Sequence, residues 1–339
     1  MAKSGRCSTS DGLTAVLRET KSPETRPTIG ITVGDPAGIG PEVALDAARD
    51  PRVLAVCRPL LIGDASLLSA CAHVTRRPAP TDLAIEHVPC RGDVTPGVVS
   101  AAAGQAAEAA IRRACELAIE GRIAAIATAP IHKVALRAAG VPHIGHTEIL
   151  ADAFGVADPL TMFVTEKMRI FFYSRHLSLR QAIDAITADG MDRFIRKVDE
   201  ALKQLGIEAP RIGLAALNPH AGDGGQFGNE EAVSLIPAAE RCRADGINVS
   251  DPIGADSVFH EALTGRWDGV VSLYHDQGHI AAKTRDFFGT VTATLGLPVL
   301  RTSVDHGTAF DIAWQRKADP ISMIGAILLA SETIALSAS

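Results

Sequence analysis

Residues 297–313 read LPVLRTSVDHGTAFDIA, a short apolar run that turns into charged residues and glycine. The segments NPHAGDGGQFG (218–228) and YHDQGHIAAK (274–283) also follow apolar runs and carry imidazoles or cations among glycines. This pattern is typical of a strand that ends in a polar loop, and ligands bind at such strand ends in open α/β sheets. We therefore expect the three segments to hold a metal and a phosphate in one site.

Strand and helix patterns alternate along almost the whole chain. Only Glu166 and Lys167 separate the runs 161–165 and 168–173, which predicts an antiparallel pair. The alternation predicts an α/β fold with a largely parallel sheet. Strands are expected at 28–33, 59–62, 83–88, 124–128, 161–165, 168–173, 211–217, 269–273, 290–295 and 299–304. Helices are expected at 43–48, 101–121, 178–186, 191–205, 230–244 and 319–338, and from residues 133 and 147 onward.

The composition fits a soluble protein with a large core. The 339 residues are 47% hydrophobic and 21% charged, and the net charge of -6 argues against nucleic acid as a general partner. No apolar run reaches the ~20 residues of a membrane helix. Residues 1–26 are polar and lack the apolar core of a secretory signal, so we interpret them as an N-terminal extension. Six cysteines without C-x-x-C spacing predict free thiols and a cytoplasmic protein.

Three histidines follow strand-like runs directly or closely: His176, His220 and His275. Three neutral imidazoles suit a divalent transition metal with an open coordination position. The alternative is that each is an ordinary surface or core histidine, since their wide separation leaves convergence open.

Cations and a helix start indicate an anion site. Lys283 and Arg301 lie in glycine-punctuated stretches with few charges, and an ammonium with a guanidinium suits a dianionic phosphate. His146 and Thr147 lie where GHTE (145–148) can begin a helix, an end that attracts anions. Solvated surface cations and a plain threonine cap are the alternatives. The stretch GDPAGIGPE (34–42) has neither the lysine of a P-loop nor G-x-G-x-x-G.

In these segments the chain resembles the 4-hydroxythreonine-4-phosphate dehydrogenase family. The resemblance runs in consistent order through GDPAGIGPE, TAPIHK (128–133), GHTE, NPHAGDGGQFGNEE (218–231), ADSVF (255–259), YHDQG (274–278) and TLGLPVLRTSVDHGTAFDIA (294–313). It implies a two-domain α/β/α fold similar to isopropylmalate and isocitrate dehydrogenases. The expected first domain comprises residues 27–145 with 300–339, and the second comprises 146–299. It also implies a homodimer whose active sites lie at the subunit interface.

The resemblance further implies the site residues. The family uses NAD or NADP without a Rossmann fingerprint, and one divalent ion such as zinc, manganese, cobalt or magnesium. The implied metal ligands are His176, His220 and His275, and the implied substrate contacts are His146, Thr147, Lys283, Thr292 and Arg301, with Thr292 where the family has an asparagine. The implied cofactor contacts are Asp305, His306, Gly307 and Asp311.

The chain departs from the family at Trp314 and Arg316, which stand in AWQRKAD (313–319) where the family pattern is AGxGxAD. An arginine in that loop favours the 2′-phosphate of NADP.

The expected reaction oxidises the 3-hydroxyl of a 4-phosphorylated four-carbon acid, and the β-keto product loses carbon dioxide. Asp256 and Lys133 are the candidate bases. Thr292, His279 and the ending AFDIA (309–313) favour 4-phospho-D-threonate or 4-phospho-D-erythronate of sugar-acid catabolism. The alternative substrate is 4-phosphooxy-L-threonine of pyridoxal phosphate biosynthesis. A metal-dependent phosphatase, a cis-dihydrodiol dehydrogenase and a non-catalytic binding protein are less favoured.

Overall fold

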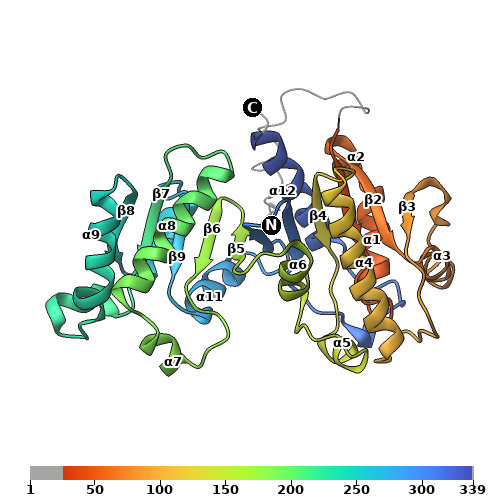
Figure 1. The fold of residues 1–339 in the computed structure, drawn as a ribbon, viewed down its shortest axis with the longest axis horizontal. Coiled ribbons are helices and arrows are strands. Elements are labelled where there is room, and N and C mark those ends of the chain that lie inside the picture. Colours follow the sequence, from red (N-terminus) through yellow and green to blue (C-terminus); the bar gives the residue numbers. More distant parts are fainter. Residues whose placement is uncertain (1–25, 338–339) are drawn as a thin grey trace, which may run out of the picture.

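A computed structural model describes residues 26–337 of the chain. Its strands form one eleven-stranded sheet in the order β3-β2-β1-β4-β11-β10-β5-β6-β9-β7-β8. The sheet runs the length of the molecule, with α3 near one end and α9 near the other (Figure 1). The strands are β1 (Thr28–Thr32), β2 (Arg58–Gly63), β3 (Ala84–His87), β4 (Ala125–Thr128), β5 (Leu160–Thr165), β6 (Met168–Phe172), β7 (Arg211–Ala215), β8 (Asn248–Ile253), β9 (Gly269–Ser272), β10 (Val291–Leu295) and β11 (Leu300–Val304).

Most neighbouring strands are parallel, and the exceptions lie together in the middle of the sheet. β10 is antiparallel to both β11 and β5, and β5 is antiparallel to β6. The predicted hairpin of residues 161–173 is therefore confirmed, with Glu166 in the left-handed region at its turn. The predicted α/β class with a largely parallel sheet is also confirmed.

Helices cover both faces of the sheet. They are α1 (Gly40–Arg49), α2 (Pro51–Val56), α3 (Ala65–Val74), α4 (Ala101–Ile119), α5 (Lys133–Ala138), α6 (His146–Phe154), α7 (Leu179–Asp184), α8 (Ala188–Gln204), α9 (Ile236–Ala244), α10 (Ala255–Leu263), α11 (His275–Arg285) and α12 (Ile321–Ser337). No helix among the described residues is both long and apolar enough to cross a membrane. The five cysteines within residues 26–337 are free thiols, as predicted.

Successive side chains of each strand point to opposite faces of the sheet, so they pack into separate hydrophobic cores on the two faces. In the half that contains β1–β4, Ile29 and Ile31 pack toward α1, α3 and α12, whereas Ile126 packs toward α4 and α6. In the half that contains β6–β9, Phe171 packs toward α8 and α9, and Ile170 packs toward α10 and α11. Ile149 and Leu150 of α6 belong to the core of the first half. The domain boundary at residue 146 stays a prediction.

Helices α2, α3 and α10 were not expected from the sequence, and neither were α11 and β8, for which the structure gives a reason. The segment YHDQGHIAAK, expected as a loop, forms most of α11, although Gly278 lies within it. A Cβ at Gly278 would lie 2.5 Å from the Phe172 ring, so glycine allows the helix to pack closely on β6. β8 contains Asp251 and Pro252, which argue against a strand, but it is an edge strand paired only with β7, where proline is tolerated.

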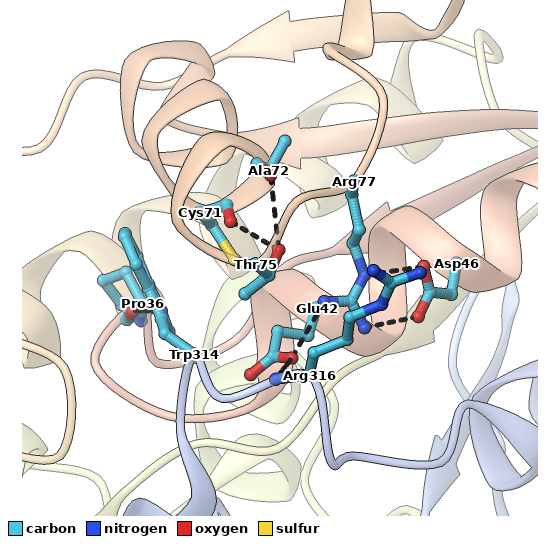
Figure 2. A network of polar contacts seen from close by, with 9 residues as sticks. All are labelled: Pro36, Glu42, Asp46, Cys71, Ala72, Thr75, Arg77, Trp314 and Arg316. Atoms are coloured by element: carbon cyan, nitrogen blue, oxygen red, sulfur yellow. Dashed lines mark hydrogen bonds and ion pairs between the residues drawn. The ribbon is translucent and has the colours of Figure 1, made fainter.

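A buried ionic network joins α1 to the segment after β11 (Figure 2). Glu42 is fully buried, and its Oε2 atom accepts hydrogen bonds from Arg77 Nη1 at 3.0 Å and from the backbone N–H of Arg316 at 3.0 Å. Arg77 Nη2 also donates to Asp46 at 2.6 Å. The Trp314 indole N–H donates to the Pro36 carbonyl at 3.1 Å.

This network holds a strained backbone. Trp314 and Arg316 have φ angles of 59° and 60°, which favour glycine, and the family pattern has glycine at both positions. The hydrogen bonds of Trp314 to Pro36 and of Arg316 to Glu42 offset that strain. The side chains of Trp314 and Glu42 thus stabilise a loop whose backbone favours glycine at two positions.

Removing Arg77 leaves the Glu42 carboxylate buried without its ionic partner. We expect Arg77→Ala to lower the free energy of unfolding by about 3 kcal/mol, because breaking one side of a buried pair leaves an uncompensated charge. Urea denaturation followed by circular dichroism measures this value. Arg52→Ala is the matched control, since the Arg52 side chain is 55% exposed beside Asp50, and it should cost under about 1 kcal/mol. Equal losses for the two variants would contradict the buried network's role.

Candidate active site

A pocket of about 260 Å³ opens beside the antiparallel centre of the sheet. Its wall combines imidazoles, cations and hydroxyls with a single aromatic ring of phenylalanine and one carboxylate. The lining residues are Thr147, Thr161, Phe163, Arg175, His176, His275, His279, Lys283, Thr292 and Asp305. Six of these were predicted from the sequence as site residues: Thr147, His176, His275, Lys283, Thr292 and Asp305.

The sheet supplies the floor of the pocket through strand register. Thr161 of β5 lies opposite Thr294 of β10, which lies opposite Arg301 of β11. Phe163 lies opposite Thr292 in the next row of the same face. Residues paired across strands share a face of the sheet. A row of hydroxyls therefore connects the pocket to the buried guanidinium of Arg301.

α11 supplies the imidazoles and the lysine on one side. His275, His279 and Lys283 recur every four residues, which places them along one face of the helix. The His275 and His279 rings stack with centroids 3.7 Å apart, and His279 Nδ1 lies 2.7 Å from the carbonyl of His275. His279 also packs against Phe163 and Phe172. His275 Nδ1 lies 2.6 Å from Asp276 Oδ1, a contact that leaves Nε2 of His275 free to bind a metal.

His176 joins His275 in the pocket, but His220 does not. Burial, followed by the charges of Arg175 and Lys133, lowers the pKa of His176 and favours the neutral imidazole that binds metals. Within residues 26–337 of one chain, no group of three or more histidine, cysteine, aspartate or glutamate side chains is arranged to hold a metal. A single chain therefore supplies two of the three predicted ligands to this pocket.

His220 lies on an exposed turn of unusual handedness. It begins a left-handed run that continues to Gly224, with φ angles between 43° and 82°. A left-handed conformation costs roughly 1–2 kcal/mol for each non-glycine residue. The buried carboxylate of Glu231 holds the start of this turn by accepting hydrogen bonds from the backbone N–H groups of Leu217 and Asn218 at 2.8 and 2.7 Å. His220 is exposed on this strained turn and does not line the pocket of its own chain.

The two cationic residues that were predicted to bind phosphate, Lys283 and Arg301, differ in their surroundings. Lys283 Nζ lies 2.8 Å from Asp305 Oδ2, so the structure places Asp305, predicted as a cofactor contact, beside a predicted substrate contact. Arg301 is 4% exposed and does not line the pocket. Its guanidinium donates to Thr128 Oγ1 at 2.7 and 3.0 Å and to Thr294 Oγ1 at 3.2 Å.

Burial leaves Arg301 and His146 without ionic compensation. Burial lowers the pKa of Arg301 to about 9, against a smaller opposing effect of Glu148. Burial, then the charge of Arg301, holds the pKa of His146 well below its usual value, and its Nε2 atom has no hydrogen-bond partner. A buried polar atom without a partner is rare in folded proteins. The buried guanidinium of Arg301 and the uncapped N–H groups at the start of α6 therefore favour an anion in this region.

Arg175 is a pocket residue that sequence reasoning missed. It follows β6 directly before His176, and its Nη1 atom donates a hydrogen bond to Thr161 Oγ1. Burial lowers the pKa of Arg175, with smaller opposing effects of Glu148 and Asp158. The signal was present in the sequence, because a cation next to a predicted ligand at a strand end follows the pattern used for Lys283 and Arg301.

The remaining predicted residues lie outside the pocket wall. Lys133 is exposed at the start of α5, and Asp256 is exposed at the start of α10. His306, Gly307 and Asp311 lie in the loop after β11. This loop packs on the GDPAGIGPE turn, because Ile39 N–H donates to the Thr308 carbonyl at 3.0 Å.

Comparisons with known proteins identify the family of the chain. A family profile described as "Pyridoxal phosphate biosynthetic protein PdxA" matches residues 55–330. A protein of Symbiobacterium thermophilum named "Putative D-threonate 4-phosphate dehydrogenase" is 50% identical over 320 residues, covering 90% of this chain and 96% of that protein. A protein of the same name from Clostridium botulinum is 46% identical, with 91% and 97% coverage.

Two solved structures share the fold at substantial identity. A 4-hydroxythreonine-4-phosphate dehydrogenase from Klebsiella pneumoniae has a TM-score of 0.83 and 39% identity, covering 91% of this chain and 99% of that one. A terephthalate 1,2-cis-dihydrodiol dehydrogenase from Burkholderia xenovorans has a TM-score of 0.64 and 32% identity, with 91% and 98% coverage. These matches confirm the predicted family, and the chain is a dehydrogenase that belongs to the PdxA family.

Proposed function

We propose that the protein oxidises the 3-hydroxyl of a 4-phosphorylated hydroxy acid with NAD or NADP, and that the β-keto product then loses carbon dioxide. The supporting observation is the pocket itself, where two cations and three imidazoles face one carboxylate. Such a wall attracts a small molecule with several negative charges. In the reaction the carbon-bound hydrogen leaves as hydride to the nicotinamide, and the hydroxyl proton is lost.

The pocket residues divide into binding and orienting groups. Lys283 and Thr147 bind the anionic end, while Asp305 holds the Lys283 ammonium in place at 2.8 Å. Anchoring at this end positions the reacting carbon beside the imidazoles. Arg301 and His146 stay proposed contacts, and the buried positive charge of Arg301 supports an anion near the start of α6. Asp256 and Lys133 stay predicted bases, since both lie outside the pocket wall of this chain.

We infer a metal site shared between two copies of the chain. His176 and His275 offer two imidazoles to one pocket, and His220 lies on an exposed left-handed turn that does not line it. A homodimer in which His220 of the partner subunit completes the set fits both observations. A divalent metal held there acts as a Lewis acid on the alcohol.

The cofactor is proposed to bind along the loop 305–313. This loop packs on the turn 34–42 and on His132, whose ring stacks on Phe310 with centroids 4.6 Å apart. Gly307 and Asp311 are exposed, as cofactor contacts must be. Asp305 belongs both to this loop and to the pocket wall, which supports a cofactor that binds next to the substrate.

The proposed substrate is 4-phospho-D-threonate or 4-phospho-D-erythronate, with 4-phosphooxy-L-threonine as the alternative. Thr292 and His279 both line the pocket, and both distinguish this chain within the family pattern. The two relatives named for D-threonate 4-phosphate support the same choice.

A spectrophotometric assay of reduced cofactor tests the function. We expect the purified protein with zinc, manganese or magnesium to form NADH or NADPH with 4-phospho-D-threonate or 4-phospho-D-erythronate. The value of kcat/KM should exceed that for 4-phosphooxy-L-threonine by at least about tenfold, because a pocket built around one C2 group rejects the other. Higher kcat/KM for 4-phosphooxy-L-threonine would reverse the substrate choice, and no turnover of any of the three would refute the function.

Complementation between inactive variants tests the shared site. We expect His220→Ala and His275→Ala to be inactive alone. After mixing under conditions that exchange subunits, they should recover about a quarter of wild-type activity, because half of the dimers are mixed and each has one intact site. Mixing His176→Ala with His275→Ala is the control, since the mutated residues share a pocket and no intact site forms. Equal recovery in both mixtures, or none in either, would contradict the shared arrangement.

The Trp314 hydrogen bond should matter for cofactor affinity. We expect Trp314→Phe to raise the KM for the nicotinamide cofactor about fivefold, the effect of one lost hydrogen bond. Its kcat and its KM for the acid should change little, because the pocket wall is untouched. Trp267→Phe is the control, since that indole donates to Glu261 at 2.7 Å in the other half of the molecule. An unchanged cofactor KM in Trp314→Phe would show that the loop does not need this bond.

A further inference from the structure

Arg175 is the pocket cation whose charge is least compensated. Lys283 is paired with Asp305 at 2.8 Å, so part of its charge is already balanced. Arg175 has no ion-pair partner anywhere in the described part of the chain, and its hydrogen bond is to the neutral hydroxyl of Thr161. A guanidinium has five N–H donors in a fixed fork. Most of the donors of Arg175 therefore remain available to a ligand.

Arg175 lies close to other groups that favour an anion. The side chain lines the pocket with Thr161 and with Thr147, the second residue of α6. The first N–H groups of a helix lack partners inside the helix and favour a negative charge. The buried, unpartnered Nε2 atom of His146 lies at the same helix start. Guanidinium, hydroxyls and helix start thus converge on one corner of the pocket.

The nearby carboxylate does not fill this role. Glu148 exerts a weak electrostatic effect on Arg175, Arg301 and His176, but it forms no ion pair with any of the three. The more distant Asp158 pairs with Lys197 instead. The corner therefore has excess positive charge, which a dianion can neutralise.

We propose that Arg175 binds the phosphate of the substrate and sets the enzyme's preference for phosphorylated acids. This inference rests on the proposed function, because it assigns one more contact to the same site. The planar guanidinium binds two phosphate oxygens side by side, and Thr147 and Thr161 offer hydroxyls to the remaining oxygen. Lysine at this position would provide the charge without the fork.

Inorganic phosphate is the probe for this corner of the pocket. Isothermal titration of phosphate into the full chain measures its Kd for the wild type and for three variants. We expect Arg175→Gln to raise the Kd by at least about tenfold, the effect of losing a charge-assisted pair of hydrogen bonds. Arg175→Lys should lie between Arg175→Gln and the wild type. Arg180→Gln is the matched control. Arg180 is exposed on α7, so this substitution removes the same charge outside the pocket.

Kinetics separate a binding role from a structural one. Arg175→Gln should raise the KM for the phosphorylated acid with a smaller effect on kcat, and its thermal unfolding should match that of the wild type. The proposal is overturned if phosphate binds Arg175→Gln as tightly as the wild type, or if the wild type binds no phosphate. Failure of the proposed function is distinct, since it appears as absent cofactor reduction whatever the phosphate affinity.

Discussion

The reversed direction of β10 is the constraint on which the site depends. β10 is antiparallel to both β11 and β5, and β5 is antiparallel to β6, so these reversals join two halves that are built from parallel strands. The register of β10 places Thr294 between Thr161 and Arg301, on the face that α6 and α11 flank. Without this pairing, the start of α6 and the histidines of α11 would not lie in one pocket. The pocket is therefore a product of the junction between the halves.

The pocket at this junction carries more positive than negative charge. Ion pairs occur widely on the surface, yet Arg175 and Arg301 face threonine hydroxyls and no carboxylate among the described residues. Burying a cation without a counter-charge costs stability, and an entering anion recovers part of that cost. Asp305 balances Lys283 and keeps the net positive charge moderate. The same imbalance explains why the substrate is expected to carry a phosphate.

Much of the fold could be predicted from the sequence, because buried strands form continuous apolar runs. The helices between them show hydrophobic residues at helical spacing and capping residues at their ends. The α11 helix was missed, since Gly278 and seven polar or charged residues hide its pattern, and its stability comes from packing on β6. The pocket positions of His176, His275 and Lys283 followed from strand-end logic. His220 was expected beside them, and within one chain it lies on an exposed left-handed turn that does not line the pocket. No local pattern encodes that turn or the register that exposes Arg175.

The most direct test of the central claim compares one acid with and without its phosphate. The rate of reduced-cofactor formation should be measured for 4-phospho-D-threonate and for D-threonate under the same metal and cofactor conditions. We predict that kcat/KM for the phosphorylated acid is higher by at least about a hundredfold, because the unbalanced cations bind only the dianion strongly. Similar kcat/KM values for the two acids would show that the cationic pocket does not select the substrate.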